Sequence, residues 1–220
     1  MEIEIAERIK KEYPGLVVKG FHVKGVAVER EKEGLERFKE TVTEEIKKDH
    51  TAETLKDAPI IRMYRDFYWR LGIDPTKTRP ASEALIRRVL KGRPLPRINT
   101  LVDAYNLASI KTNVALAAFD GDRLTGRLTM DFAEAGEEFT GIGMERPIRL
   151  TGKEPVIRDE KQTIAVYPYR DSDATKVTLD TENALILVCG VPGITEGMME
   201  KTAKIASEYI TRFCGGEARL

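Results

Sequence analysis

Apolar residues recur every three or four positions through the first half of the chain, and the second half changes to the shorter spacing of β-strands. A three-to-four period is that of an amphipathic helix packed on a core. It predicts helices over residues 31–55, 59–71, 80–91 and 100–110. Gly72 and Gly92 follow two of these segments, where glycine readily takes the left-handed conformation that ends a helix, and Pro80 stands where the third begins.

Short strands are expected on both sides of these helices. Residues 1–30 predict a short helix, a turn at Pro14-Gly15 and one or two strands over residues 16–28. From Val114 on, strands are predicted at residues 114–120, 123–130, 137–143, 147–150, 155–160, 161–170 and 176–179, and the apolar run over residues 184–193 is expected to become a buried strand. Asp120-Gly121 predicts a β-hairpin between the first two of them. A helix over residues 195–213 ends the pattern.

The order of these elements predicts an α+β fold. Helices come first, many strands follow and one helix closes the chain, whereas a doubly wound fold alternates strands with helices. The 220 residues suffice for one sizeable core. We expect residues 1–58 to be an N-terminal extension packed on a single globular unit of residues 59–220.

Composition excludes several classes of function. Thirty-six basic residues balance thirty-six acidic ones, so only a local patch would attract nucleic acid. The chain has only two histidines and two cysteines, and their spacing is not that of metal ligands, which argues against a metal site. It has no nucleotide-binding, CxxC or HExxH motif, so the sequence predicts no cofactor. The acidic N-terminus and the lack of a long apolar run predict a cytoplasmic protein without a membrane partner.

Residues 62–97 carry ten basic residues against three acidic ones. Arginine favours planar partners such as phosphate and carboxylate, so the segment is a candidate for binding an RNA backbone or an acidic ligand. The candidates for RNA contact are Arg62, Arg65, Arg87, Arg88 and Arg93. The alternative is that Arg65, Arg87 and Arg88 pair with acidic residues of the strand-rich half. The residues alone favour neither interpretation.

Two turns carry polar groups whose role the sequence leaves open. Residues 190–197 are rich in glycine and precede a helix, so their amides are able to hold an anion. A plain strand-to-helix turn is favoured, because no lysine follows as in a phosphate-binding loop. The turn around Arg170 and Asp171 either lines a pocket or holds a local ion pair.

A long stretch of the chain resembles a known family. The run MYRDFYWRLGIDPTKTRPASEALIRRVLKGRPLPRINTLVDAYNLASI, followed by FDGDRL, VIRDE and YRDSDATKVT in that order, is similar to the B3/B4 domain of the phenylalanyl-tRNA synthetase β chain in its free-standing form. The resemblance implies an α+β fold with a β-sandwich-like core of short strands flanked by helices. It also implies an editing pocket that hydrolyses mischarged aminoacyl-tRNA, with tRNA or its aminoacylated 3′ end as the partner.

The resemblance carries over residue by residue, with three differences. Leu101, Val102, Asp103 and Asn106 match the family's L-V-D-x-T-N pattern, and Tyr105 replaces its threonine. Ala117 stands where the family's pocket has a histidine. The strand after Thr181 and Asn183 has no acid at the place of the editing glutamate.

An activated aminoacyl ester needs no protein nucleophile, because a positioned water and a polarised carbonyl suffice. The resemblance therefore leaves room for hydrolysis by polar side chains of the matching segments. Candidate catalytic residues are Asn106 or Ser109 to orient water, Arg170 to face the oxyanion or a phosphate, and Asp171. Either Asp171 or Asp103 is expected to bind the α-amino group. Further candidates for binding the substrate are Arg79, Asn99 and Asp120.

Each of these candidates also has a structural alternative. Asp103 is placed to cap a helix or to pair with Arg97. Asn106 is placed to brace its helix, and Arg170 and Asp171 are placed to pair with each other.

The leading hypothesis is recognition of aminoacyl-tRNA with hydrolysis of a mischarged ester in trans. The first alternative is a non-catalytic module that binds tRNA, an amino acid or a protein, and the missing histidine and glutamate favour it. The second is an enzyme that acts on a small amino-acid derivative without RNA. The sequence predicts neither the amino acid nor the oligomeric state.

Overall fold

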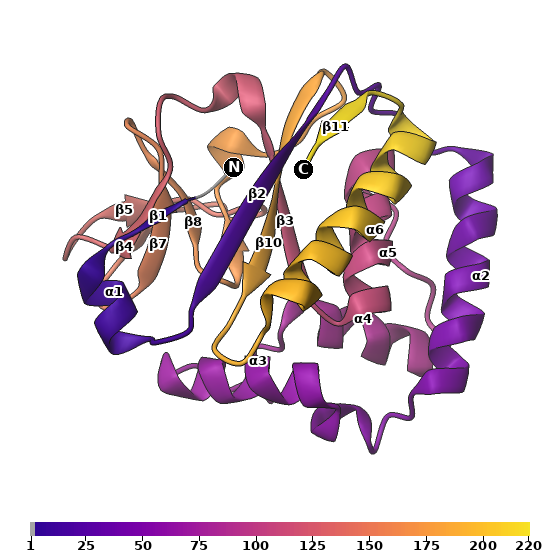
Figure 1. The fold of residues 1–220 in the computed structure, drawn as a ribbon, viewed down its shortest axis with the longest axis horizontal. Helices are drawn as coiled ribbons and strands as arrows, with labels where there is room; N and C mark the ends of the chain where they lie inside the picture. Colours follow the sequence, from indigo (N-terminus) through magenta and orange to yellow (C-terminus); the bar gives the residue numbers. More distant parts are fainter. Residues whose placement is uncertain (1–2) are drawn as a thin grey trace.

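The computed structural model describes residues 3–220, which form two β-sheets beside a layer of helices (Figure 1). The central sheet has four antiparallel strands in the order β11-β2-β10-β3. These strands are β2 (Val17–Lys24), β3 (Ala115–Asp120), β10 (Asn183–Gly190) and β11 (Glu217–Arg219). β10 lies between β2 and β3 and is buried along nearly its whole length, which explains its continuous apolar run.

The second sheet has five strands in the order β1-β4-β7-β8-β9 and packs beside the central sheet. The strands are β1 (Glu4–Ile5), β4 (Thr129–Phe132), β7 (Pro155–Arg158), β8 (Thr163–Val166) and β9 (Arg170–Asp171), and a separate pair is formed by β5 (Glu138–Phe139) and β6 (Ile148–Arg149). Buried residues of both sheets, such as Phe119 and Ile157, belong to one apolar cluster. The predicted α+β fold with a sandwich-like core is confirmed.

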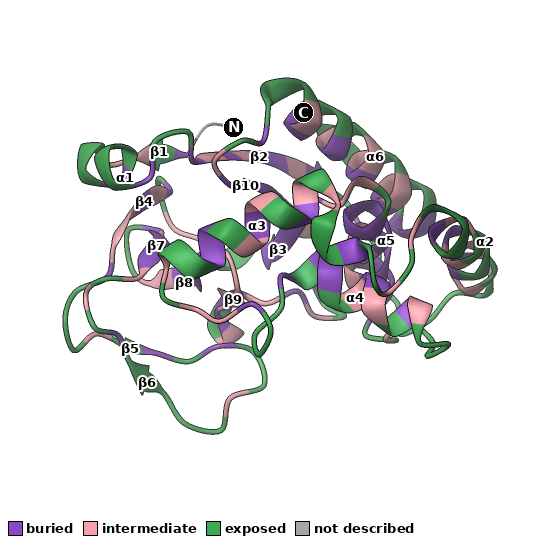
Figure 2. Ribbon diagram, turned by 90° about the horizontal axis from the view of Figure 1, so that it is seen from below, coloured by how far each residue is buried: buried purple, intermediate pink, exposed green. Residues whose placement is uncertain are grey.

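The helices cover the other face and one end of the central sheet (Figure 1). α5 (Thr100–Thr112) packs along α6 (Glu196–Cys214), while α2 (Glu33–Asp49) and α4 (Ala81–Leu90) pack against α5. α3 (Pro59–Arg70) runs across the end of the sheets with an exposed outer face, and α1 (Glu7–Glu12) is a short helix (Figure 2). The glycine-rich stretch after β10 is a turn, and the Thr195 hydroxyl caps α6 by accepting from the Met198 amide.

Local signals placed the helices well. Pro80 caps α4, and Gly72 and Gly92 take left-handed φ angles of 74° and 70° after α3 and α4. The predicted hairpin at Asp120-Gly121 is wrong, because β3 pairs with β10 whereas β4 lies in the other sheet. The Asp120 carboxylate accepts hydrogen bonds from the Asp122 amide and the Thr181 hydroxyl, and a short 3₁₀ turn leads the chain away.

Residues before position 59 contribute to both sheets. β2 lies between β10 and β11, and β1 pairs in parallel with β4. α2 adds Leu35, Val42 and Ile46 to the apolar core. Residues 3–58 thus share sheets and core with the rest of the chain, and the division into an extension of residues 1–58 and a globular unit of residues 59–220 stays a prediction.

Three further features bear on the type of protein. Within residues 3–220, no helix is long and apolar enough to cross a bilayer. Cys189 and Cys214 are both buried, free thiols. The same residues contain no group of three or more His, Cys, Asp or Glu side chains arranged to hold a metal ion.

Two tyrosine hydroxyls fix the end of β10. Tyr64, on α3, is fully buried; its hydroxyl donates to the Cys189 carbonyl oxygen and accepts from the Ala115 amide at 2.9 Å. Tyr167, which follows β8, donates to the Gly190 carbonyl oxygen at 2.7 Å. The two hydroxyls therefore join α3 and the second sheet to the same end of β10. The Ala115 amide and the Cys189 carbonyl, at the last pair of the β3–β10 ladder, both have hydrogen-bond partners.

Replacing Tyr64 by phenylalanine is expected to lower the free energy of unfolding by about 1–3 kcal/mol, because it leaves a buried amide and a buried carbonyl without partners. Urea denaturation measures this change. Tyr13→Phe is the control, since Tyr13 packs its ring against Phe67 but its hydroxyl makes no hydrogen bond to a described residue. An equal loss in both variants would contradict the role given to the Tyr64 hydroxyl.

Candidate functional site

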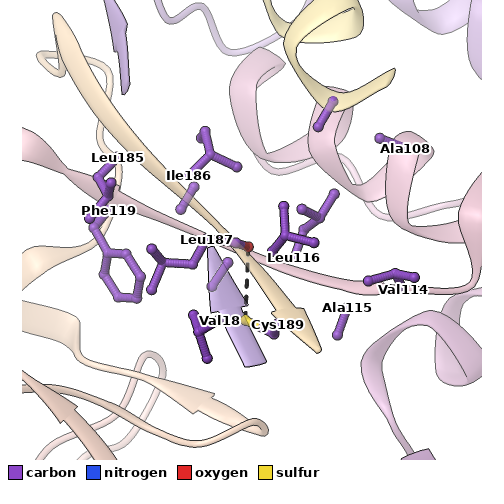
Figure 3. Close-up of a cluster of buried hydrophobic side chains, with 14 of the residues drawn as sticks. Val18, Ala108, Val114, Ala115, Leu116, Phe119, Leu185, Ile186, Leu187 and Cys189 are labelled. Atoms are coloured by element: carbon purple, nitrogen blue, oxygen red, sulfur yellow. Dashed lines mark hydrogen bonds between the residues drawn. The ribbon is translucent and has the colours of Figure 1, made fainter. Parts of the chain in front are cut away.

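A cavity of about 120 Å³ is lined by residues of both sheets, by the middle of α5 and by the first residue of α4. Ala115, Leu116, Ala117 and Phe119 of β3 line it. Its apolar walls are formed mainly by Ala115, Ala117, Phe119, Leu187, Cys189, Ile157, Ala165 and Val166. Figure 3 shows the β3 and β10 part of this wall, with Phe119, Leu187 and Cys189 labelled. The volume is below the range of about 300–1,000 Å³ that is usual for pockets of drug-sized ligands, so the cavity has room for a small group and not for a nucleotide.

The polar side chains that line the cavity are Tyr105, Asn106, Tyr167, Tyr169 and Asp171, and the Tyr167 hydroxyl donates to the Gly190 carbonyl oxygen. Tyr105 and Asn106 come from α5, and Asp171 comes from β9 at the edge of the second sheet. None of the Tyr105, Asn106 and Asp171 side chains makes a hydrogen bond or ion pair with a residue in the described part of the chain. All three residues are half-buried, and the arrangement leaves donors and an acceptor available to a ligand or to water.

Asp171 has the most altered acidity in the cavity. Burial among protein atoms raises the pKa of its carboxyl from 3.8 to about 7. Arg170 precedes it in sequence but makes no ion pair with it within residues 3–220. A carboxyl with a pKa near neutrality exchanges its proton readily at physiological pH, which is the property of a general base.

The neighbouring groups stay protonated. Burial, with a smaller contribution from the Asp171 charge, raises the pKa of the Tyr105 hydroxyl and of the Cys189 thiol. The Cys189 thiol lies 3.8 Å from the Leu187 carbonyl oxygen (Figure 3). Because a thiol reacts as its thiolate, Cys189 is not a nucleophile here at neutral pH.

The structure brings two of the four predicted catalytic residues together, namely Asn106 and Asp171. Ser109 is buried and donates to the Val114 carbonyl oxygen at 2.8 Å, so its hydroxyl holds the end of α5. Arg170 lies outside the cavity lining, and its side chain packs over Gly141. The suggested pairing of Arg170 with Asp171 is not formed among the described residues.

Three predicted substrate-binding residues support the backbone instead. Asn99 caps α5 by accepting from the Val102 amide at 2.9 Å. Asp120 holds the turn after β3. Asp103 forms a buried ion pair with Lys39 at 2.6 Å and accepts from the Ile98 amide. The suggested pairing of Asp103 with Arg97 is replaced by this pair, since Arg97 contacts Glu31 and Glu36 instead.

The fourth, Arg79, lies in a separate basic groove along α4. We call it the α4 groove. Its six basic residues are Lys77, Arg79, Arg87, Arg88, Lys91 and Arg93, and Ala84, Leu85 and Pro96 complete the lining. No carboxylate of the described chain lines it. Three of the five predicted RNA-binding arginines, Arg87, Arg88 and Arg93, are therefore gathered in one place.

The two other arginines lie elsewhere and are paired. Arg62 contacts Asp66 at 3.2 Å, and Arg65 contacts Glu83 at 3.0 Å. Glu83 is fully buried and also pairs with Arg87 at 2.8 Å. The alternative of internal ion pairs thus applies to Arg65 and Arg87, but their partner is on α4 and not in the strand-rich half.

Sequence reasoning missed Tyr105 and Cys189 as residues of the cavity. Tyr105 was visible as the one departure within an otherwise matching helix, directly before Asn106. Cys189 lies in a continuous apolar run whose two faces are indistinguishable until the neighbouring strands are known.

Comparisons with known proteins agree with this architecture. The family model "B3/4 domain" matches residues 63–217. The phenylalanine–tRNA ligase β subunit of Moorella thermoacetica is 32% identical over 134 residues, which are 60% of this chain and 16% of that protein. The corresponding subunit of Fusobacterium nucleatum is 30% identical over 100 residues, or 45% of this chain and 12% of that protein.

A solved structure has the same fold. It is an N-terminal fragment of the phenylalanyl-tRNA synthetase β subunit from Pyrococcus horikoshii, with a TM-score of 0.53 and 15% identity, and the match covers 99% of this chain and 50% of that one. The chain spans less than a fifth of the length of the two ligase subunits.

The raised pKa of Asp171 predicts a pH-dependent stability. Between about pH 4 and pH 7 the folded protein keeps a proton that the unfolded chain has lost, so stability falls as pH rises through this range. Asp171→Asn removes this loss. The variant is expected to match the wild type near about pH 4 and to exceed its free energy of unfolding by roughly 2–4 kcal/mol at about pH 8.

Urea denaturation of both proteins at several pH values measures this difference in the free energy of unfolding. The other titrating groups are the same in both proteins, so their contributions cancel. Asp173→Asn is the control, because Asp173 pairs with Lys176 outside the cavity. A difference between wild type and Asp171→Asn that does not change with pH would show that the carboxyl titrates normally.

Proposed function

Because the chain belongs to the B3/4 domain family, we propose that it recognises the 3′ end of an aminoacyl-tRNA and hydrolyses a mischarged aminoacyl ester in trans. The ligase subunits that share this domain carry tRNA in their names. A protein with this function acts where aminoacyl-tRNA is made, in the cytoplasm. The observation that carries the proposal is the single carboxyl of the cavity, Asp171, with its pKa near 7.

Asp171 is suited to activate water. Its carboxylate takes a proton from a water molecule while the water oxygen attacks the ester carbonyl carbon. The tetrahedral intermediate then breaks the bond between that carbon and the ribose oxygen. The ribose oxygen takes the proton back from Asp171, which leaves a free amino acid and a free ribose hydroxyl.

Two donors support the developing negative charge. The Asn106 amide and the Tyr105 hydroxyl face the same cavity from consecutive positions of α5. Because burial raises the pKa of Tyr105, its hydroxyl keeps the proton that it would donate to an oxyanion. Fixed donors in a site with little water are the usual source of oxyanion stabilisation.

The walls support an apolar amino-acid side chain as the group that the cavity accepts. Methyl groups of Ala115, Ala117 and Ala165 line it, and Leu187 and Ile157 add branched side chains. Ala117 occupies the position at which the family's pocket has a histidine. A polar side chain would therefore find few partners here beyond Tyr105, Asn106 and Asp171.

A second candidate function is non-catalytic binding of an amino acid or of a charged tRNA end. The observation that favours it is the absence of any histidine, or of a carboxyl other than Asp171, from the cavity lining within residues 3–220. In that case Asp171 would bind the α-ammonium group and no bond would break. The two candidates share a ligand and differ in whether the ester survives.

Deacylation of a panel of correctly and wrongly charged tRNAs by the purified protein tests the proposal. The wild type is expected to cleave one class of ester selectively, with a rate that rises with pH and levels off above about 7, where Asp171 is ionised. Asp171→Asn is expected to lower the rate about 100- to 10,000-fold, the usual contribution of a general base. Asn106→Ala should lower it less.

Asp173→Asn is the matched control, since it removes the same charge two residues away and outside the cavity. Cleavage that stays at the spontaneous rate, with charged tRNA still bound, would replace the hydrolytic proposal by the binding module. Equal rates for Asp171→Asn and wild type would remove Asp171 from the mechanism.

A further inference from the structure

We infer that the α4 groove holds the phosphates of a single-stranded RNA segment and leads its 3′ end to the mouth of the cavity. This inference rests on the proposed function, because it assigns a path to the RNA of the same substrate. It is carried by unneutralised charge, by the position of the groove beside the cavity and by its length.

The charge of the α4 groove is largely uncompensated. Arg79, Lys91 and Arg93 are exposed, and their side chains form no ion pair or hydrogen bond with any residue between 3 and 220. Arg88 donates to the Pro94 carbonyl oxygen and has no acidic partner there, and the Lys77 ammonium lies 4.0 Å from the nearest oxygen of Asp74. In a protein with balanced charges, such a cluster gives a local positive potential that attracts an external anion.

Several other surface arginines are paired with acidic residues, although exposed lysines such as Lys11, Lys201 and Lys204 form no ion pair within residues 3–220. Arg62, Arg97 and Arg37 each contact a carboxylate within 3.2 Å. The α4 groove differs from the rest of the described surface in gathering six basic residues along one hollow that no carboxylate lines.

The groove starts at the mouth of the cavity. Ala81, the first residue of α4, lines the cavity and is exposed, whereas the β3 and β10 residues of the lining are buried. Arg79 stands two residues before Ala81 and lines the groove. A strand that followed the groove towards Arg79 would bring its end to Ala81, next to Asn106.

The length of the groove fits a short single strand. α4 has ten residues and is about 15 Å long, with Arg79 at the near end and Lys91 and Arg93 at the far end. Leu85 and Ala84 lie between the cations. Cations along an apolar floor suit a nucleic-acid backbone, and the planar guanidinium groups match phosphate oxygens in pairs.

The test compares the affinity for uncharged RNA of two triple variants with the same loss of charge. Arg79→Gln/Lys91→Gln/Arg93→Gln empties the groove of its unpaired charges. Lys11→Gln/Lys201→Gln/Lys204→Gln is the control, since these exposed lysines lie on α1 and α6. The probes are unfractionated deacylated tRNA and a short single-stranded RNA that ends in CCA, measured by fluorescence anisotropy over a series of salt concentrations.

The groove variant is expected to lose about 100-fold in affinity at about 0.1 M salt. The slope of log K against log salt should fall in magnitude by about 2, which corresponds to three lost phosphate contacts on a single strand. The control should keep the slope of the wild type. Matching urea transitions of both variants show that the fold is kept.

Unchanged affinity and slope in the groove variant would overturn the inference. Binding of polyglutamate in place of RNA, with the same sensitivity to the variant, would also overturn it and assign the groove to an acidic protein. Because the probes carry no ester, loss of RNA binding in the groove variant supports the path even if no aminoacyl ester is cleaved. Conversely, if the wild type cleaves an ester and the groove variant binds RNA as tightly as the wild type, the proposed function stands and the RNA path along the groove is rejected.

Discussion

The hydrogen bonds at the end of β10 hold together the parts of the molecule that enclose the cavity. The Tyr64 hydroxyl satisfies the Cys189 carbonyl and the Ala115 amide, and Tyr167 satisfies the Gly190 carbonyl. Cys189 and Ala115 belong to the cavity wall, so the tyrosine that closes the ladder also sets the distance between its two strands at the site. Gly190 permits this approach, because a Cβ there would lie 2.7 Å from the Val17 side chain and 2.8 Å from the Met199 sulfur.

Two buried carboxyl groups of this fold differ from the half-buried Asp171 in having basic partners. Asp103 and Glu83 are matched by basic partners within the core, and such pairs support structure because each charge is compensated. Asp171 has no such partner in the described chain, and its burial therefore costs stability once it ionises. Asp171 lies on the edge strand β9, and two donors without partners in the described chain, Tyr105 and Asn106, line the same cavity. An unpaired carboxyl beside such donors is typical of a functional site rather than of a core.

Local patterns predicted the helices, whereas contacts distant in sequence decided the site. Helix ends at Gly72 and Gly92 depend on neighbours within a few residues, and they were found where expected. The hairpin prediction failed because the partner of β3 is β10, more than sixty residues later, and a turn signal at Asp120 carries no information about that choice. Likewise, the residues near Tyr64 in the sequence do not predict that its hydroxyl donates a hydrogen bond to the Cys189 carbonyl oxygen.

The cavity with Asp171 and the α4 groove need opposite electrostatic surroundings, and α4 separates them. An acid that takes a proton from water near pH 7 must lie away from cations, since a nearby arginine would lower its pKa. A phosphate site needs cations without acids. Glu83, which points into the core, neutralises Arg65 and Arg87, whereas Arg79, Lys91 and Arg93 stay unpaired on the outer face. Of α4, Ala81 and not an arginine borders the cavity that Asp171 lines, so one helix serves both requirements.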